Sequence, residues 1–390
     1  MKKILAIAIA SAFAAPAFAA TSNVDIYGAI GLSFDYVDGG SCTAGVDCIV
    51  TPGFAADSSE SRARVSNSNS YIGFKGAEDL GGGLSAVWQI EQAIAPDAGG
   101  GTWATGRNTF AGLSSKTLGT VTLGSQDTPY KTSTGKLDVF TTHYIADYRS
   151  LFGQPTNGSV RAANSVLYTS PSLGGLTLRG MGAAQQENGS TRDPRLYSLS
   201  GVYENGPLYA ALAYESTRYA TGSAAMIASA GGNSYATDAA STAETDQKKW
   251  RAGVGYSFGN TKLGVGYERS NWDSDALTGT IDGGQTSVST SRNAWYVGAA
   301  HAIGNTTLKA AYTKAGDLKG ASNTGATQIS LGATYALSKR TEVFGLYTQV
   351  KNDSDAAYSL GGGATGTPET LAAAYGQDPR GISLGMVHKF

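Results

Sequence analysis

The chain is poor in the residues from which metal centres and many catalytic sites are built. Its 390 residues include 2 cysteines, 3 histidines and 4 methionines, and only 15% are charged. His143, His301 and His388 have no ligand-like spacing to one another, and a single pair of cysteines falls short of the four ligands of a structural zinc site. We therefore expect neither a metal centre nor another cofactor.

An excess of basic charge is also missing. The 29 Lys and Arg residues are balanced by 30 Asp and Glu residues, which gives a formal net charge of −1. Nucleic-acid-binding proteins usually carry a basic excess, so we expect no nucleic-acid partner. Few charges together with 53 glycines and 21 tyrosines are untypical of a soluble α/β enzyme or a disordered chain. They favour many short strands joined by polar loops.

Long apolar runs are absent after the N-terminus, where one short run stands. Met1-Lys2-Lys3 is basic, Ile4–Ala15 is apolar, and Ala17-Phe18-Ala19 places small residues where a signal peptidase reads them. We predict a signal peptide over residues 1–19, with cleavage after Ala20 as the near alternative. An N-terminal membrane anchor is the other interpretation, but the run is shorter than the roughly 20 residues that a spanning helix needs.

The two cysteines, Cys42 and Cys48, lie close together in a stretch rich in Gly, Ser and Asp. An exported chain folds in an oxidising compartment, where neighbouring thiols tend to pair. We predict a disulfide that closes one loop, with two free thiols as the alternative.

Residues 20–390 divide into about sixteen segments that alternate apolar and polar residues with period two. The first runs near Asn23–Val37 and the last over Gly381–Phe390. Seven short turns, such as Gly259-Asn260 and Gly304-Asn305, alternate with eight longer polar connections. This alternation is typical of an antiparallel meander with one bare rim and one rim that carries loops.

The solvation of the backbone in a bilayer limits which folds this pattern can form. Every backbone N–H and C=O group must be paired in lipid, so only helices and closed barrels can span a membrane. We predict an all-β fold, a 16-stranded antiparallel transmembrane β-barrel wide enough to enclose water. A soluble β-sandwich or β-propeller is the alternative, but neither a blade-length repeat nor a second domain boundary is visible.

Several blocks, spread over the chain in order, carry a resemblance to a known family. They are Asn23–Gly28, Tyr71–Gly81, Phe110–Ser114, Gly119–Gly124, Asn164–Pro171, Leu337–Thr341 and His388–Phe390. These blocks resemble the strands and turns of the sixteen-stranded trimeric porins of Gram-negative bacteria, of the betaproteobacterial and neisserial type. The resemblance implies an outer-membrane channel through which small hydrophilic solutes and ions diffuse passively.

The same resemblance implies partners. A porin of this type is a homotrimer that contacts outer-membrane lipid and lipopolysaccharide. Its terminal aromatic residue, here Phe390, is recognised by the barrel-assembly machinery.

The resemblance further implies that the third long loop, about Gln126–Arg161, folds inward and narrows the pore. Acidic loop residues would face basic wall residues, and such a transverse field selects solutes by charge. The predicted constriction residues are Lys75, Arg107, Asp127, Asp138, Asp147, Arg149, Arg161 and Arg179. His143 of this loop is either a pH-sensitive group or an ordinary solvated side chain.

This sequence departs from the family at several wall positions. Tyr71, Ser85, Ser125 and Val387 stand where the family often has a basic residue. A wall that has lost several basic residues should be less anion-selective. We therefore expect weak charge selectivity or a preference for cations.

An outer-membrane enzyme and an adhesin are the alternative functional classes. Gly381–Gly385 matches the G-x-S-x-G motif of serine hydrolases, which requires a strand-to-helix turn and a later histidine across the fold. Here the segment continues a strand toward the C-terminus, so we predict no catalytic residues and no enzyme activity. An adhesin would have a barrel without an open lumen.

Overall fold

The computed structural model describes residues 23–40, 61–97, 103–140, 144–153, 161–184, 195–219, 245–274, 288–361, 373 and 376–390. The predicted signal peptide, the cysteine pair Cys42 and Cys48, and His143 lie outside the described residues.

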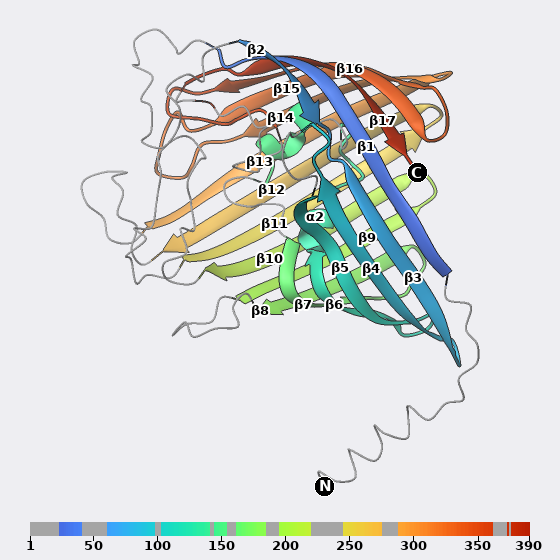
Figure 1. Ribbon diagram of the computed structural model, residues 1–390. Coiled ribbons are helices and arrows are strands. Elements are labelled where there is room, and N and C mark those ends of the chain that lie inside the picture. The colour runs from blue at the N-terminus through green and yellow to red at the C-terminus, as the bar shows by residue number, and fades with distance from the viewer. Residues whose placement is uncertain are drawn as a thin grey trace.

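Strands make up most of the described chain, and each pairs antiparallel with its neighbours in one sheet (Figure 1). Their bounds are β1 (Asn23–Asp38), β2 (Arg62–Asn67), β3 (Tyr71–Gly81), β4 (Leu84–Ile94), β5 (Trp103–Ser115), β6 (Gly119–Asp127), β7 (Arg161–Thr169), β8 (Leu176–Ala184), β9 (Arg195–Asn205), β10 (Leu208–Tyr219), β11 (Thr245–Phe258), β12 (Thr261–Ser274), β13 (Val288–Ile303), β14 (Thr306–Ala315), β15 (Ala326–Ala336), β16 (Thr341–Asn352) and β17 (Arg380–Lys389).

The sheet closes on itself because its first and last strands pair. β1 and β17 are in register from Ala29 opposite Lys389 to Asp38 opposite Arg380. β3 pairs with the first half of β1 and β2 with its second half, so β2 and β3 together occupy one position in the sheet. The seventeen labelled strands therefore form a closed, sixteen-stranded antiparallel barrel, which confirms the predicted fold.

Ser68, Asn69 and Ser70 interrupt the position shared by β2 and β3. Asn69 has φ 60°, a left-handed conformation that Asn tolerates better than most residues. The Ser70 hydroxyl accepts a hydrogen bond from Gly31 N at 2.9 Å and donates one to Gly31 O at 3.1 Å. The backbone groups of β1 thus stay paired across the interruption, as burial requires.

The alternation along each strand separates an apolar outer face from a more polar inner face. On β17, Ile382, Leu384 and Met386 are 52%, 60% and 49% exposed, whereas Ser383 and Val387 are 2% exposed. The apolar side chains predicted to share a face therefore point outward. A soluble protein would bury that face, whereas a membrane barrel presents it to lipid.

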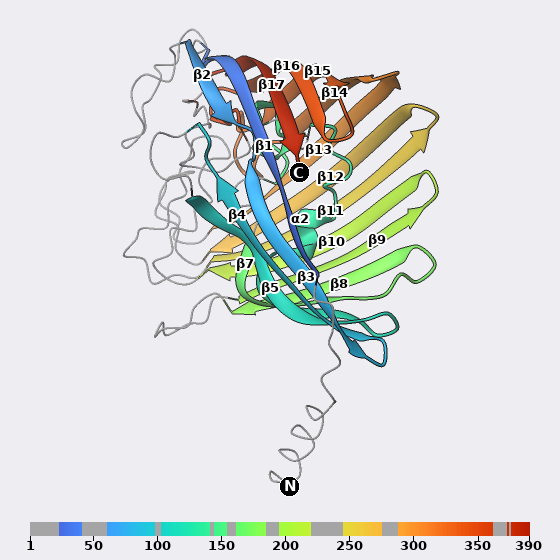
Figure 2. The same ribbon diagram turned by 45° about the vertical axis from the view of Figure 1, so that its right-hand side comes forward.

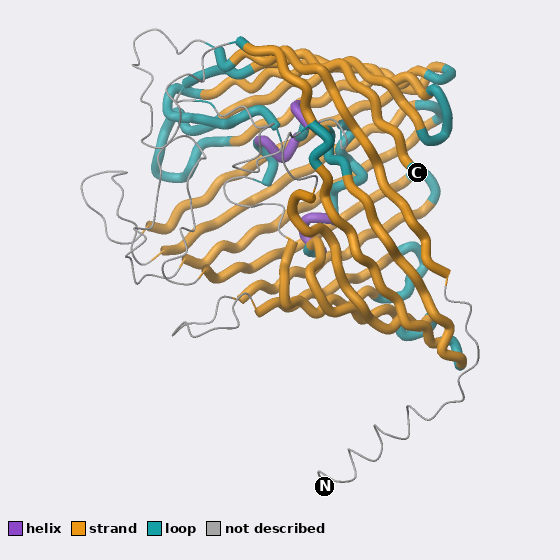
Figure 3. The backbone as a smooth tube through the Cα atoms, viewed as in Figure 1, coloured by secondary structure: helices purple, strands orange, loops and turns teal. Residues whose placement is uncertain are grey.

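The two rims of the barrel differ as the sequence predicts. Gly259 and Gly304 begin two of the tight turns and have positive φ angles of 53° and 58°, which glycine adopts without a Cβ penalty. The long connection between β6 and β7 contains α2 (Pro129–Thr132) and the 3₁₀ turns η1 (Tyr144–Ala146) and η2 (Tyr148–Ser150). Strands surround these helical turns in two views of the chain (Figures 2 and 3).

The C-terminal residue takes part in the closure of the barrel. Gly28 N donates a hydrogen bond to Phe390 O, and Phe390 N donates one to Gly28 O, both at 3.1 Å. A Cβ at position 28 would lie 2.6 Å from the Phe390 ring and 2.6 Å from Tyr71 O. Only glycine fits between the terminal ring and the neighbouring strand.

We predict that Gly28→Ala weakens this closure, because the added methyl group overlaps a backbone oxygen that cannot move independently. Overpacking of this kind costs about 1–3 kcal/mol. The temperature at which the folded barrel converts to the slower-migrating unfolded form in SDS gels should fall. Gly182→Ala is the control, since its Cβ would meet only Tyr197 Cδ1 at 4.0 Å. Equal stability of the two variants would contradict the prediction.

Candidate functional site

One carboxylate of the inner wall, Glu268 on β12, holds both ends of the described segment between β6 and β7. The Tyr130 hydroxyl of α2 donates to Glu268 Oε2 at 2.5 Å, and Gly153 N donates to Glu268 Oε1 at 2.9 Å. Burial raises the pKa of Tyr130 well above its usual value, so the hydroxyl keeps the proton that it donates. Glu268 therefore ties the beginning and the end of this segment to the wall.

Arg251 on β11 neutralises Glu268. Its Nη2 lies 2.5 Å from Glu268 Oε2, and both side chains are at most 2% exposed. The guanidinium carbon also lies 4.2 Å from the ring centroid of Tyr130 and 4.8 Å from that of Phe152. A buried carboxylate is tolerated only when it is paired and hydrogen-bonded, and Arg251 satisfies this requirement while stacking on two rings of the inserted segment.

Arg292 on β13 supplies a second cation at the same place. Its Nη2 donates to Leu151 O at 3.0 Å, and its Nη1 donates to the Tyr358 hydroxyl at 2.7 Å. Nη2 also lies 4.0 Å from Glu268 Oε1. Arg292 thus connects the inserted segment to the connection between β16 and β17, to which Tyr358 belongs.

The middle of the segment packs on apolar or side-chain-free parts of the inner wall. Leu137 is 1% exposed, and a Cβ at Gly253 or Gly255 of β11 would lie 2.4 or 2.8 Å from its methyl groups. Ile145 of η1 belongs to a buried cluster with Phe344 of β16. The segment therefore extends from the wall at β11 and β12 to the wall at β16.

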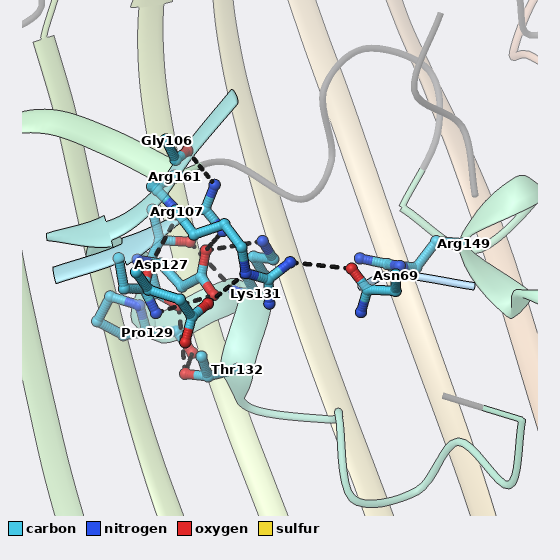
Figure 4. Close-up of polar contacts among 12 residues, drawn as sticks. Asn69, Gly106, Arg107, Asp127, Pro129, Lys131, Thr132, Arg149 and Arg161 are labelled. Carbon is cyan, nitrogen blue, oxygen red and sulfur yellow. Dashed lines mark hydrogen bonds and ion pairs between the residues drawn. The ribbon is translucent and has the colours of Figure 1, made fainter. Parts of the chain in front are cut away.

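A second group of polar side chains surrounds Asp127 where β6 ends (Figure 4). Asp127 Oδ1 lies 2.7 Å from Lys131 Nζ and 3.2 Å from Arg161 Nη2. The Asn108 side chain accepts from Arg161 Nε at 2.9 Å and donates to Asp127 Oδ2 at 3.3 Å. The charge of Asp127 is therefore shared by two cations at the start of the inserted segment.

Aromatic and charged side chains form a third group on the inner faces of β1, β3, β4 and β5. Arg107 pairs with Glu91, and its guanidinium lies 4.7 Å from the ring centroid of Tyr71. The Tyr27 hydroxyl donates to Glu91 at 3.0 Å, and Lys75 Nζ lies 5.1 Å from the Tyr27 ring centroid. The cations Lys75 and Arg107 thus alternate with the rings of Tyr27 and Tyr71 along this part of the wall. The side chain of Lys75 is exposed.

Two further predicted residues pair within the inserted segment. Asp147 caps η2 by accepting from Arg149 N at 2.9 Å, and the Arg149 guanidinium binds the same carboxylate. Arg179 of β8 donates to Thr132 Oγ1 at 3.3 Å. Asp147 therefore faces a cation of its own segment, and Arg179 contacts α2 from the wall.

Asp138 lies apart from these pairs, on the stretch between α2 and η1. Its Oδ1 accepts from Phe140 N at 2.9 Å and from the Tyr296 hydroxyl at 3.4 Å. Burial, together with the negative charge of Asp147, raises the pKa of Asp138 to about 7. Its carboxyl group changes charge near neutral pH.

The structure brings together some of the residues predicted from sequence. Asp127 meets Arg161, Asp147 meets Arg149, and the Tyr27 and Tyr71 rings connect Lys75 to Arg107. Sequence reasoning missed the anchoring residues and several partners of these groups. They are Glu91, Tyr130, Lys131, Arg251, Glu268 and Arg292.

A signal for Arg251 was present in the sequence. Trp250 belongs to the apolar face of its strand, so period-two counting places Lys249 and Arg251 on the inner face. Both are buried, and Lys249 Nζ lies 2.9 Å from Glu215 Oε1. The same counting places Glu268 on the inner face, because Tyr267 belongs to the apolar face of β12, but its contact with Tyr130 joins residues 138 positions apart.

Within the described part of the chain, no three His, Cys, Asp or Glu side chains are grouped to hold a metal ion. No helix among the described residues is both long and apolar enough to cross a membrane.

Comparisons with known proteins agree with this architecture. The family model described as "Gram-negative porin" matches residues 6–356. The chain belongs to the Gram-negative porin family.

Among curated relatives, outer membrane porin protein 32 of Delftia acidovorans is 28% identical over 400 residues, covering 100% of both chains. Major outer membrane protein P.IB of Neisseria gonorrhoeae is 30% identical over 229 residues, covering 57% of this chain and 59% of that protein. Among solved structures, an anion-selective porin from Comamonas acidovorans has 26% identity and a TM-score of 0.71, covering 95% of this chain and 100% of that one. OmpF of Salmonella typhi, at 17% identity and a TM-score of 0.61, shares the fold.

The protein is accordingly an outer-membrane porin of the Gram-negative type, a channel for passive diffusion. In such barrels the short turns lie on the periplasmic side and the longer loops on the extracellular side. The segment between β6 and β7 thus starts and ends at the extracellular rim and descends into the barrel.

We predict that Glu268→Gln loosens the inserted segment of this porin, because Arg251 would keep its buried charge without a carboxylate. Removing one partner of a buried ion pair costs roughly 3–5 kcal/mol. The variant should unfold at lower temperature, and trypsin should cleave faster after Lys131, Lys136 or Arg149 in the detergent-solubilised barrel.

Glu204→Gln is the matched control for that experiment. Glu204 Oε1 lies 2.5 Å from Lys136 Nζ of the same segment, but the two side chains are 46% and 67% exposed. Exposed pairs contribute about 0–1 kcal/mol. If the two variants lost equal protection from trypsin, Glu268 would not be the anchor.

We also predict that Asp138 makes stability depend on pH. The folded protein holds this proton more tightly than the unfolded chain, whose aspartates titrate near about 4. The stabilisation is therefore complete below pH ~4 and is lost as pH rises through about 7. Asp147, Arg149 and Tyr296 face Asp138 from the segment and the wall, and Lys262 and Lys309 interact with it electrostatically.

Thermal unfolding at pH 5 and pH 8 tests this dependence. Asp138→Asn keeps the acceptor for Phe140 N but cannot ionise, so its melting temperature should rise relative to that of the parent between pH 5 and pH 8. Identical pH profiles of the two proteins would contradict the prediction.

Proposed function

We propose that the inserted segment and the basic residues of the facing wall form the constriction of this porin and set its charge selectivity. The supporting observation is that Glu268 fixes both ends of the described segment across the barrel interior. The proposed constriction residues are Lys75, Arg107, Asp127, Asp138, Asp147, Arg149, Arg161 and Arg179.

The pairing of these residues argues for weak selectivity. Arg107 is paired with Glu91, Arg149 with Asp147, and Arg161 with Asp127. An arginine neutralised by a carboxylate within a few ångströms contributes little net field to a passing ion. The strongest cations of the constriction therefore largely cancel against their partners.

Lysines on the inner wall give the remaining field its sign. No carboxylate oxygen of the described residues lies within 4.0 Å of Nζ of Lys75, Lys262 or Lys309. Lys262 and Lys309 stand near the periplasmic ends of β12 and β14, where the Lys262 ammonium donates to Lys136 O of the inserted segment. We infer weak selectivity with a slight preference for anions, whereas the expectation from sequence was weak selectivity or a preference for cations.

We infer that this channel catalyses no reaction. Gly381–Gly385 lies within β17 and makes no strand-to-helix turn. The Ser383 hydroxyl is 2% exposed and donates to Asp35 Oδ1 at 2.5 Å, so its hydrogen-bond acceptor is an inner-wall carboxylate and not the histidine that the motif requires. This arrangement supports a structural role for the motif.

The same family membership supports a proposal on export and assembly. We propose that residues 1–19 are removed on export, that Cys42 and Cys48 form a disulfide, and that Phe390 is recognised by the barrel-assembly machinery. We further propose a homotrimer that contacts outer-membrane lipid and lipopolysaccharide. The described outward faces of β3, β4, β5 and β6 carry no lysine or arginine, which suits contact with a neighbouring subunit.

We predict that the double variant Lys262→Gln and Lys309→Gln shifts selectivity toward cations, because it removes two lumen charges while keeping polar side chains. In planar bilayers under a salt gradient, the parent should give a small reversal potential of anion-selective sign. The variant should move it toward zero or beyond, with conductance still measurable.

Lys351→Gln serves as the comparison, since this exposed lysine lies on the outward face of β16. Its reversal potential should equal that of the parent. A strongly cation-selective parent, or an equal shift in both variants, would refute the assignment of the lumen lysines.

A further inference from the structure

The side chain of Tyr27 on β1 lies across the inner wall, because the neighbouring strand has no side chain at that place. Gly73 of β3 stands directly opposite Tyr27, and Glu91 of β4 stands directly opposite Gly73. A Cβ at Gly73 would lie 2.4 Å from Tyr27 Cζ and 2.7 Å from its Cε1, so only glycine leaves room for the ring. The Tyr27 hydroxyl reaches Glu91 and donates to it at 3.0 Å. The ring is therefore fixed at its backbone end and at its hydroxyl end.

Tyr71 on β3 forms a corner with this ring. The two ring centroids are 6.1 Å apart, and the ring planes meet at 67°. Ala29 and Ala93, the residues directly opposite Tyr71 on β1 and β4, are small and leave the corner open. Both tyrosines are half-buried, so part of each ring faces the lumen. A flat solute can lie on one ring with its edge against the other.

Three polar side chains form a row beside the Tyr27 ring, on the side nearer the tight turn between β3 and β4. Asp25, Lys75 and Gln89 stand directly opposite one another on β1, β3 and β4, and their side chains share the inner face with the two rings. Such neighbours have Cβ atoms about 5 Å apart. The row therefore offers an acceptor carboxylate, a donor ammonium and an amide within the width of one small solute.

Lys75 is held only weakly in its present position. Its Nζ lies over the Tyr27 ring, 5.1 Å from the centroid, and its side chain is exposed. An ammonium on a flexible four-carbon stem reorients readily, and an exposed cation–π contact contributes only about 0.5–1 kcal/mol. Lys75 can therefore leave the ring face and donate to a solute that takes its place there.

The charges around the corner balance one another. Arg107 pairs with Glu91 while its guanidinium lies 4.7 Å from the Tyr71 ring centroid, and Lys75 stands directly opposite Asp25. Among the described residues, two cations and two carboxylates thus border the rings. An inorganic ion or an aromatic carboxylate would meet a like charge beside each counter-charge, so the corner favours a neutral solute.

We propose that the corner formed by Tyr27 and Tyr71 is a lumen binding site for one neutral sugar ring. A pyranose carries C–H groups on its faces and hydroxyl groups around its rim. The C–H groups would pack on the Tyr27 ring, whose face carries partial negative charge, while the hydroxyl groups would bond to Asp25, Lys75 and Gln89. The inference rests on the proposed constriction, to which Lys75 and Arg107 belong, and it adds a class of solute to that proposal.

The test measures sugar binding as current noise of the full mature channel in a planar bilayer. Graded concentrations of glucose should produce excess noise that saturates, because each bound sugar ring briefly obstructs the lumen. Sorbitol, an acyclic sugar alcohol of nearly equal size, should produce none, since it has no ring face to lie on Tyr27.

Two variants separate the Tyr27 ring from its hydroxyl. Tyr27→Leu removes both, and the glucose concentration at half-saturation should rise roughly twofold to tenfold, the range that an aromatic contact contributes. Tyr27→Phe loses the same hydroxyl but keeps the ring, so its half-saturation should stay near that of the parent. Tyr312→Leu is the matched control, because it removes an exposed tyrosine ring from the outward face of β14 and should leave glucose binding unchanged.

Equal noise with glucose and sorbitol would overturn the proposal, as would equal weakening by Tyr27→Phe and Tyr27→Leu. A response to benzoate without a response to glucose would also overturn it and would assign the corner to aromatic anions. Salt conductance without sugar separates the two levels of inference. A parent that conducts salt but ignores glucose contradicts the sugar site alone, whereas a parent that does not conduct contradicts the proposed constriction as well.

Discussion

In a hydrocarbon environment each backbone N–H and C=O group must find a partner within the protein, and the architecture depends on this constraint. Antiparallel pairing of β1 with β17 satisfies it by closing the sheet. The Ser70 hydroxyl satisfies it where β2 and β3 are interrupted. Closure in turn fixes which side chains meet lipid, because alternate residues of every strand must point outward.

A barrel of sixteen strands is too wide for the side chains of its wall to fill, and three of the buried apolar clusters among the described residues include inserted chain. Leu137 packs against wall glycines, Ile145 against Phe344, and Tyr130 and Phe152 against the Arg251 guanidinium. Polar anchoring accompanies this packing, since the inner wall is polar. A buried carboxylate with two nearby arginines fixes the position of the segment, which a purely apolar contact would specify less strictly.

The fold was predictable to a large extent, whereas the interior contacts were not. Period-two alternation located strands such as β12 and β17, and Gly259 and Gly304 marked tight turns, because these features depend on neighbouring residues alone. Asp127 and Arg161 were predicted as constriction residues through resemblance to a family, and their side chains lie 3.2 Å apart. Lys131 stands only four residues after Asp127, so their pairing is a local contact. The anchor formed by Glu268 with Tyr130 joins residues 138 positions apart, and local sequence carries no signal for such a contact.

The sequence by itself determined that this chain forms a closed membrane barrel with an apolar exterior, because the spacing of apolar residues along a strand decides which face meets lipid. It also determined which rim carries the long loops. Tertiary structure decided which charges cancel and which remain. Arg107 lies against Glu91, whereas Lys262 and Lys309 interact with Asp138 over a longer distance. The distance between charges, and not their number in the chain, sets how strongly they interact.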